Sequence, residues 1–172
     1  YKEDLIGVII YGSLSMANTW QKYGTDETEV VELKRLCCID ATKKNTESFF
    51  IAKTIKFLKK YSNFKTIVSY ADPYFNHQGT IYKASNFTHK GYTAKSKVIF
   101  YKNKIYHDKT IRSVDDKKRL KPFTYEIKEA LQLGQATYID KPPKHIYCYE
   151  IKRRNNDLPQ AKSLEYNQMS LV

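Results

Sequence analysis

The stretch NTESFFIAKTIKFLKKY, residues 45–61, together with TIVSYA, residues 66–71, decides the fold of this 172-residue chain. In the first segment, lysines lie largely off the apolar stripe and gather in the last turn, where cations favour a helix end. Asn45 is a good N-cap residue, and the second segment is a short, β-branched apolar run. The sequence therefore predicts a helix leading into a buried strand. The stripe consists of Phe50, Ile51, Thr54, Ile55 and Leu58.

Similar patterns extend outward from this centre. A strand–helix–strand–helix core is expected from Leu33 to Gly91, with parallel pairing across the long helix and antiparallel pairing in a later hairpin. The fold class is mixed α/β, in one domain over residues 1–172 with an irregular tail from residue 152. Strands are expected at 5–11, 29–39, 66–71, 95–101, 104–108 and 145–151, helices at 79–85 and 125–133, and a loop with one helical turn at 13–27.

The composition limits the class of protein. Thirty Lys and Arg against eighteen Asp and Glu give a net charge of +12, which favours an anionic partner, above all nucleic acid, or reflects a solvated basic surface. No apolar window reaches 18 residues, so we expect no membrane span. We expect a cytoplasmic location instead. The three cysteines lack a Cys-x-x-Cys spacing, so buried free thiols are expected. Because the chain begins at Tyr1, we expect a native N-terminus to lie upstream.

The loop DATKKNTES, residues 40–48, opens the long helix. Helix N-terminal amides attract anions, and hydroxyl and amide side chains add donors there. Asn45, Thr46 and Ser48 are therefore candidate residues for binding a phosphate-bearing cofactor. The alternative is an ordinary capped helix.

Polar residues cluster after the buried strand, in SYADPYFNHQGTIYKASN, residues 69–86. Side chains that transfer protons gather where α/β sheets bind ligands. Each of them alone is more often a turn, loop or packing residue, but their density predicts a catalytic site. The candidates are Tyr70, Asp72, His77 and Tyr82, with Asn86 as a further cofactor-binding candidate.

Two basic sets are candidates for phosphate contacts, with solvated surface as the alternative. The four histidines show no metal-ligand spacing. Residues 11–13 are a third candidate for chemistry, a strand end whose glycine allows a close backbone approach, with a plain turn as the alternative. The first basic set is Lys117, Lys118, Arg119 and Lys121, and the second is Lys152, Arg153 and Arg154.

The order of these elements, with a terminal Asn-Phe-x-x-x-Gly at 86–91, resembles the GNAT acyltransferase fold. More specifically, ELKRLCCID, KNTESFFIAKTIKFLKK and IVSYADPYFNHQGTIYKASNFTHKG are similar to the Mom family of phage DNA-modification proteins. GVIIYGS and KPPKHIYCY are similar to a lesser degree. The resemblance spans most of residues 5–150.

The resemblance implies a DNA-modifying transferase. It implies an acetamido (methylcarbamoyl) group on the exocyclic amino group of adenine in phage DNA, which protects that DNA from host restriction. It places the acid on Asp72, the tyrosine on Tyr82 and the donor-facing residue on Ser48. An iron requirement is implied without ligands that we can place. The family also carries a His-Tyr segment before the first strand.

The acyltransferase signature Gln/Arg-x-x-Gly-x-Gly/Ala is absent, and KKNTES stands in its place at 43–48. The donor is therefore acetyl-coenzyme A or another activated acyl or aminoacyl compound. Two alternatives to a modifier of double-stranded DNA stay open. One is an acyl-CoA-dependent N-acyltransferase acting on a small-molecule or protein amine, and the other is an inactive nucleic-acid-binding module.

Overall fold

The computed structural model describes residues 4–112, 114 and 119–153. The chain forms two compact units, each built from more than one segment. The first unit takes Tyr1–Ala71, His77–Tyr92 and His145–Val172, and the second takes Asp72–Asn76 and Thr93–Lys144. That residues 1–172 behave as one domain stays a prediction.

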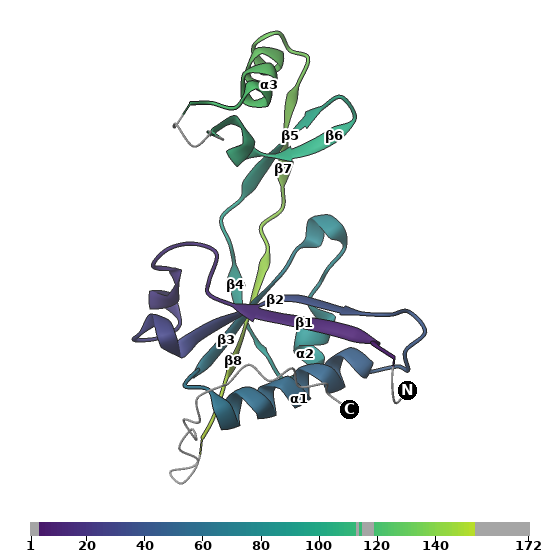
Figure 1. The fold of residues 1–172 in the computed structure, drawn as a ribbon, viewed down its shortest axis with the longest axis vertical. Helices are drawn as coiled ribbons and strands as arrows, with labels where there is room; N and C mark the ends of the chain where they lie inside the picture. Colours follow the sequence, from purple (N-terminus) through teal and green to yellow (C-terminus); the bar gives the residue numbers. More distant parts are fainter. Residues whose placement is uncertain (1–3, 113, 115–118, 154–172) are drawn as a thin grey trace. The chain divides into compact units, whose positions relative to one another are not determined.

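The first unit is built on a five-stranded sheet with the order β1-β2-β3-β8-β4 (Figure 1). β2 and β3 pair in parallel across the helix between them, and the other neighbours pair antiparallel. The prediction of a mixed, largely antiparallel α/β fold with flanking helices is therefore confirmed; its likeness to the GNAT fold stays a prediction. The strands are β1 (Gly7–Gly12), β2 (Val30–Cys38), β3 (Thr66–Ala71), β4 (Thr88–Tyr92) and β8 (His145–Glu150).

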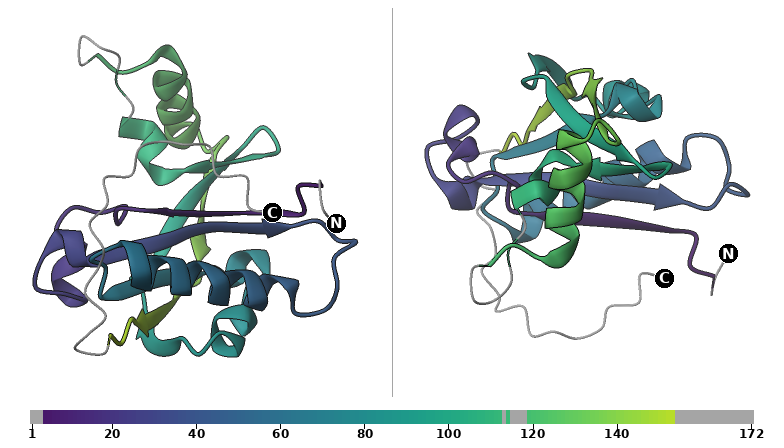
Figure 2. Two further views of the ribbon diagram at one scale, coloured as in Figure 1. Left: turned by 60° about the horizontal axis from the view of Figure 1, so that its bottom comes forward. Right: turned by 90° about the horizontal axis from the view of Figure 1, so that it is seen from above.

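The long helix α1 (Thr46–Tyr61) covers one face of this sheet (Figure 2). Its stripe buries Ile51 and Ile55 against a core that includes Ile67 of β3 and Tyr147 of β8. The expected cap is wrong in one respect: Asn45 occupies the N-cap position in a left-handed conformation, and its side chain makes no capping hydrogen bond. The short helix α2 (Thr80–Ala84) lies on the same side, with Ile81 and Tyr82 packed against the same core.

The other face of the sheet carries a smaller core of Val30, Val68 and Cys148, covered by residues of the loop after β1. That loop holds two short 3-10 helices, η1 (Thr19–Lys22) and η2 (Glu27–Glu29), the first at the predicted helical turn.

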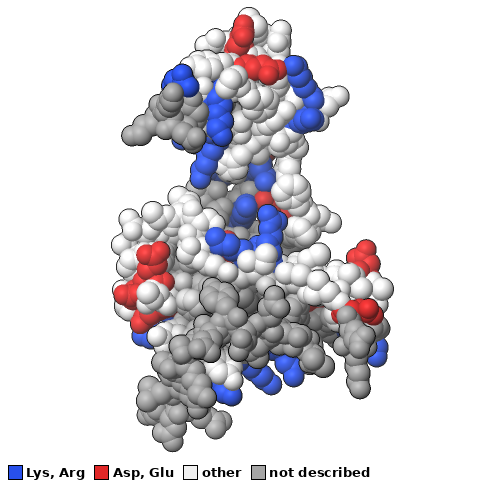
Figure 3. All heavy atoms as spheres, viewed as in Figure 1, with Lys and Arg blue, Asp and Glu red and all other residues white. Residues whose placement is uncertain are grey.

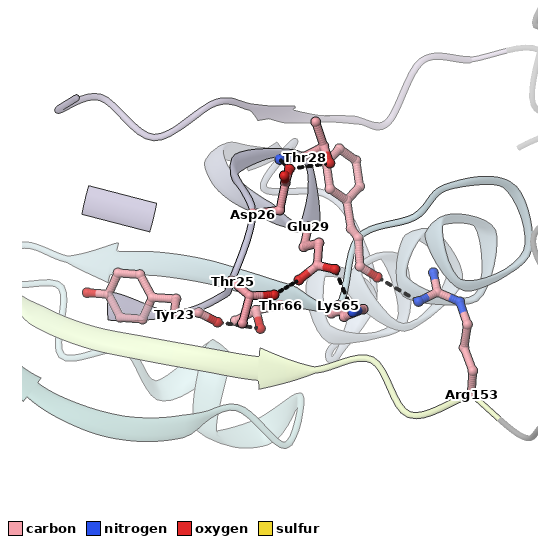
Figure 4. Close-up of polar contacts among 9 residues, drawn as sticks. Tyr23, Thr25, Asp26, Thr28, Glu29, Lys65, Thr66 and Arg153 are labelled. Atoms are coloured by element: carbon pink, nitrogen blue, oxygen red, sulfur yellow. Dashed lines mark hydrogen bonds and ion pairs between the residues drawn. The ribbon is translucent and has the colours of Figure 1, made fainter. Parts of the chain in front are cut away.

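Polar contacts join the loop after β1 to the residues at the start of β3. Glu29 accepts from Thr25 and pairs with Lys65, while the Thr66 hydroxyl donates to the Tyr23 carbonyl (Figure 4). The loop is thus tied to the start of β3.

The second unit is a three-stranded antiparallel sheet with the order β6-β5-β7 and its own core. Ile99 and Tyr101 of β5 pack against Ile127 and Ala130 of the helix α3. Its elements are η3 (Pro73–Phe75), β5 (Ser96–Tyr101), β6 (Lys104–His107), η4 (Asp108–Arg112), α3 (Pro122–Gln132) and β7 (Thr137–Lys141).

Two expectations need correction. Strands β4 (THKGY) and β7 (TYIDK) were not expected, because most of their side chains are polar or exposed and their alternation is hidden. Cys37 is exposed rather than buried, because the second half of β2 is exposed or half-buried, unlike its buried first half. No helix among the described residues is long and apolar enough to cross a membrane.

Candidate functional site

The predicted proton-transfer residues of the first unit are divided by the sheet. Side chains alternate along β3, so Tyr70 packs with the core that contains Val68, while Ser69 points to the α1 side. Tyr82 of α2 packs with the core on the α1 side. The structure therefore places Tyr70 and Tyr82 on opposite faces, and His77 is exposed in the loop before α2. Burial raises the pKa of Tyr70.

Hydroxyl groups lie near Tyr82 on the α1 side of the sheet. The Ser69 hydroxyl donates to the Leu33 carbonyl at 3.0 Å. The Tyr11 hydroxyl lies 2.8 Å from Thr54 Oγ1. Burial raises the pKa of Tyr82, and it raises the pKa of Tyr11 against the lowering effect of the hydrogen bond with Thr54. Both phenols therefore keep their protons at neutral pH and are suited to donate.

Tyr147 fixes the place of Tyr82. Its ring is fully buried, lies 5.4 Å from that of Tyr82, and its hydroxyl donates to the Gln78 carbonyl at 2.9 Å. Gly79 follows with φ +73°, and a Cβ there would clash with the Tyr147 ring. Glycine at this position lets the chain enter α2 directly over Tyr147.

A pocket of about 360 Å³ lies where α1 begins and α2 ends. Three of the four predicted cofactor-binding residues line it: Asn45, Ser48 and Asn86. Thr46 is not part of the lining, and its hydroxyl donates to the Lys43 carbonyl. The remaining lining residues are Phe49, Ala52, Ile55, Lys56, Ala84, Ser85 and Tyr149.

Ser85 is the unusual residue of this pocket. It is 9% exposed, and within the described part of the chain its Oγ is a buried side-chain oxygen without a hydrogen-bond partner. Such a group costs free energy unless something satisfies it. A ligand in this pocket is one way to satisfy it. Ser48 differs, because its hydroxyl donates to the Asn45 carbonyl.

Asp72, the predicted acid, is held within the second unit. Its Oδ1 accepts from the Tyr74 backbone N–H at 3.1 Å, and its Oδ2 lies 3.0 Å from Lys141 Nζ and 3.4 Å from Lys144 Nζ. Burial acts to raise the pKa of Asp72, but the two lysines and the backbone N–H outweigh it, so the net pKa lies below 3.8. The carboxylate is ionised at neutral pH and is a weak base.

The predicted nucleic-acid contacts are only partly described. Lys117, Lys118 and Arg154 lie outside the described residues, while Lys121 is exposed at the N-terminus of α3. Figure 3 shows Lys and Arg side chains on both units.

Arg153 is a different case from the rest of the basic set. Its guanidinium donates to the backbone carbonyls of Lys59, Ser62 and Phe64, so it anchors the chain after β8 to the end of α1. Figure 4 draws one of these contacts. Its expected phosphate contact is replaced by this structural role.

Metal ligands do not cluster in the described residues: no group of three or more His, Cys, Asp or Glu could hold an ion. His89 and His145 come near one another, with ring nitrogens 3.2 Å apart. Two ligands are fewer than an iron site normally draws from protein side chains. The described residues therefore do not by themselves supply a ligand set for the implied iron, and the iron requirement stays a prediction.

Reasoning from the sequence missed several residues of this site. Lys141 and Lys144 contact Asp72 although they follow it in the chain by 69 and 72 residues, so the sequence around Asp72 gives no local signal of them. Ser85 lies inside the motif at 69–86 but looks like an ordinary helix end. Tyr11 and Thr54 could be found only as residues on the inner faces of β1 and α1.

Comparison with known proteins identifies the family of this chain. Among curated proteins, the methylcarbamoylase Mom of Escherichia phage Mu is 28% identical over 116 residues, which is 64% of this chain. The aligned region is 47% of that relative, so it spans about half of the relative's length. A family model described as the Mom protein family matches residues 1–168. The chain therefore belongs to the Mom protein family.

Proposed function

We propose that the protein is a DNA-modifying transferase that acts on the exocyclic amino group of adenine. It adds an acetamido (methylcarbamoyl) group and so protects phage DNA from host restriction in the host cytoplasm. Family membership and the name of the phage Mu relative support this class of activity. The net charge of +12 supports a polyanionic substrate such as double-stranded DNA.

The pocket at the start of α1 carries the proposal, as the binding site of the donor. Its polar lining includes Asn45 and Ser48 at the start of α1, and helix N-termini suit a phosphate or carboxylate. Its apolar lining includes Phe49 and Ile55. This combination fits an activated acyl or aminoacyl donor with an anionic group. Acetyl-coenzyme A belongs to this class, although a glycine-rich loop is absent from residues 43–48.

Tyr82 is the proposed proton donor. In the transfer, the adenine nitrogen forms a bond to an electrophilic carbon of the donor, and the bond from that carbon to the leaving group breaks. The phenol gives its proton to the leaving group, and the proton lost by the attacking amine restores it. Tyr82 is half-buried, and burial raises its pKa, so that the phenol keeps its proton at neutral pH; this supports the role.

Asp72, in the second unit, is proposed to bind and orient N–H groups of the substrate, since a carboxylate whose pKa is lowered accepts hydrogen bonds from N–H groups well and removes protons poorly. The target base would be flipped out of the duplex to reach the enzyme, as enzymes acting on bases require. His77 is exposed and stays a secondary candidate in the loop before α2. No step uses iron, because the described residues do not supply a ligand set for it.

The test is nucleoside mass spectrometry on plasmid DNA from cells that express the protein. A modified adenosine is expected with the wild type and is expected to fall strongly with Tyr82→Phe. Tyr106→Phe, a matched phenol removed from β6 of the second unit, is the control and should leave the level unchanged. Unmodified DNA with soluble, folded wild-type protein would contradict the proposal.

A further inference from the structure

Lys141 is a buried cation with an unusual set of neighbours. Its side chain is 11% exposed and that of Asp72 is 12% exposed, with 3.0 Å between Nζ and Oδ2. The same ammonium lies 4.5 Å from the ring centre of Tyr74 and 4.7 Å from that of Phe75. A desolvated ammonium is stabilised by both a carboxylate and ring faces.

One short turn supplies all these partners. Asp72 caps the 3-10 helix η3, and Tyr74 and Phe75 belong to it, with their rings perpendicular and 5.1 Å apart. The lysine comes from the end of β7, a distant part of the sequence in the same compact unit. The turn therefore wraps around an ammonium group that only the tertiary fold delivers.

We propose that Lys141 is a positioning residue that holds the Asp72 carboxylate in one fixed orientation, an inference that rests on the orienting role proposed above for Asp72. Lys144 lies farther from the carboxylate, at 3.4 Å, and its side chain is 45% exposed. It adds positive charge without enclosing Asp72. The charged groups facing Asp72 in these contacts are thus Lys141 from β7 and Lys144 from the link to β8.

A structural ion pair alone would give the same contacts, so the test needs a readout of Asp72 itself. Selective ¹³C labelling of aspartate carboxyl groups gives the titration of Asp72 by NMR, with the Asp72→Asn spectrum as its assignment. In Lys141→Met the pKa of Asp72 should rise, because burial remains while its nearest cation is lost. Lys141→Arg keeps the cation and should keep the pKa low.

The same variants are then measured for modified adenosine in plasmid DNA over a range of pH. Lys141→Met should lower the level by on the order of 10- to 100-fold, as expected when a catalytic group is misplaced by about 1 Å. The acid limb of its pH profile should move to higher pH, and Lys141→Arg should restore both level and profile. Lys97→Met is the matched control, since Lys97 pairs with Asp140 at 3.8 Å on an exposed surface of the same unit.

Lys141→Gln replaces Lys141→Met if the methionine variant does not fold, because its amide still reaches toward Asp72. The proposal is overturned if the Asp72 titration is unchanged without Lys141, or if an active wild type stays fully active as Lys141→Met. Wild-type protein that modifies no DNA contradicts the proposed function instead. The NMR comparison then still decides whether Lys141 fixes Asp72, because it needs no activity.

Discussion

Removing the Ser85 hydroxyl should stabilise the protein and impair its function at the same time. Ser85 is 9% exposed, and its Oγ lacks a partner within the described residues. An unsatisfied buried polar group costs about 1–3 kcal/mol. Ser85→Ala removes that cost but also loses the packing contacts of the oxygen. The free energy of unfolding of the ligand-free protein should therefore rise by a net value of about 1 kcal/mol.

Ser69→Ala is the matched control, because Ser69 is fully buried and its hydroxyl donates to the Leu33 carbonyl at 3.0 Å. The same deletion there leaves a carbonyl acceptor without its donor and should lower the free energy of unfolding by about 1–2 kcal/mol. The two variants therefore change stability in opposite directions. For a chain of this size, 1 kcal/mol corresponds to a shift of about 2–4 °C in Tm.

Thermal unfolding by circular dichroism measures both variants, and nucleoside mass spectrometry measures their activity. Ser85→Ala should reduce modified adenosine by about tenfold if the donor satisfies this hydroxyl, a loss of roughly 1.4 kcal/mol. Equal destabilisation by Ser85→Ala and Ser69→Ala would show that Ser85 already has a partner in the free protein. The argument for a ligand-binding pocket at Ser85 would then fail.

Three further predictions concern the backbone, the carboxylate and the thiols. Gly79→Ala should lower the free energy of unfolding by about 1 kcal/mol for the strained backbone and by more for the clash with Tyr147, and thermal unfolding should show this as a lower Tm. An unchanged Tm would show that α2 can shift freely. Because the folded pKa of Asp72 is lowered, its stabilising effect should be complete above its ordinary 3.8 and be lost as pH falls through the folded value. Urea unfolding should then show a steeper acid loss of stability in the wild type than in Asp72→Asn, and parallel curves would refute it. Burial raises the pKa of Cys148 to about 11, so a thiol reagent at pH 8 should label the exposed Cys37 quickly and Cys148 only after unfolding; equal labelling rates in the native protein would contradict this.

The sequence by itself determined the elements whose signals are local. The helix at 46–61 and the strand at 66–71 follow from the periodicity of their own residues. The parallel pairing of this strand with β2 follows because the helix connects the two strands as a crossover. The motif at 69–86 and the helix start at Asn45 also contain most of the polar residues that line the pocket.

Only the tertiary structure decided which of these residues meet. Alternation along β3 separates Tyr70 from Ser69, and the pairing of β4 and β7 depends on partner strands rather than on their own polar sequences. The state of Asp72 depends on Lys141, 69 residues away. Periodicity reports on one element at a time, whereas burial, pKa and the satisfaction of a hydroxyl depend on neighbours that chain folding brings from elsewhere.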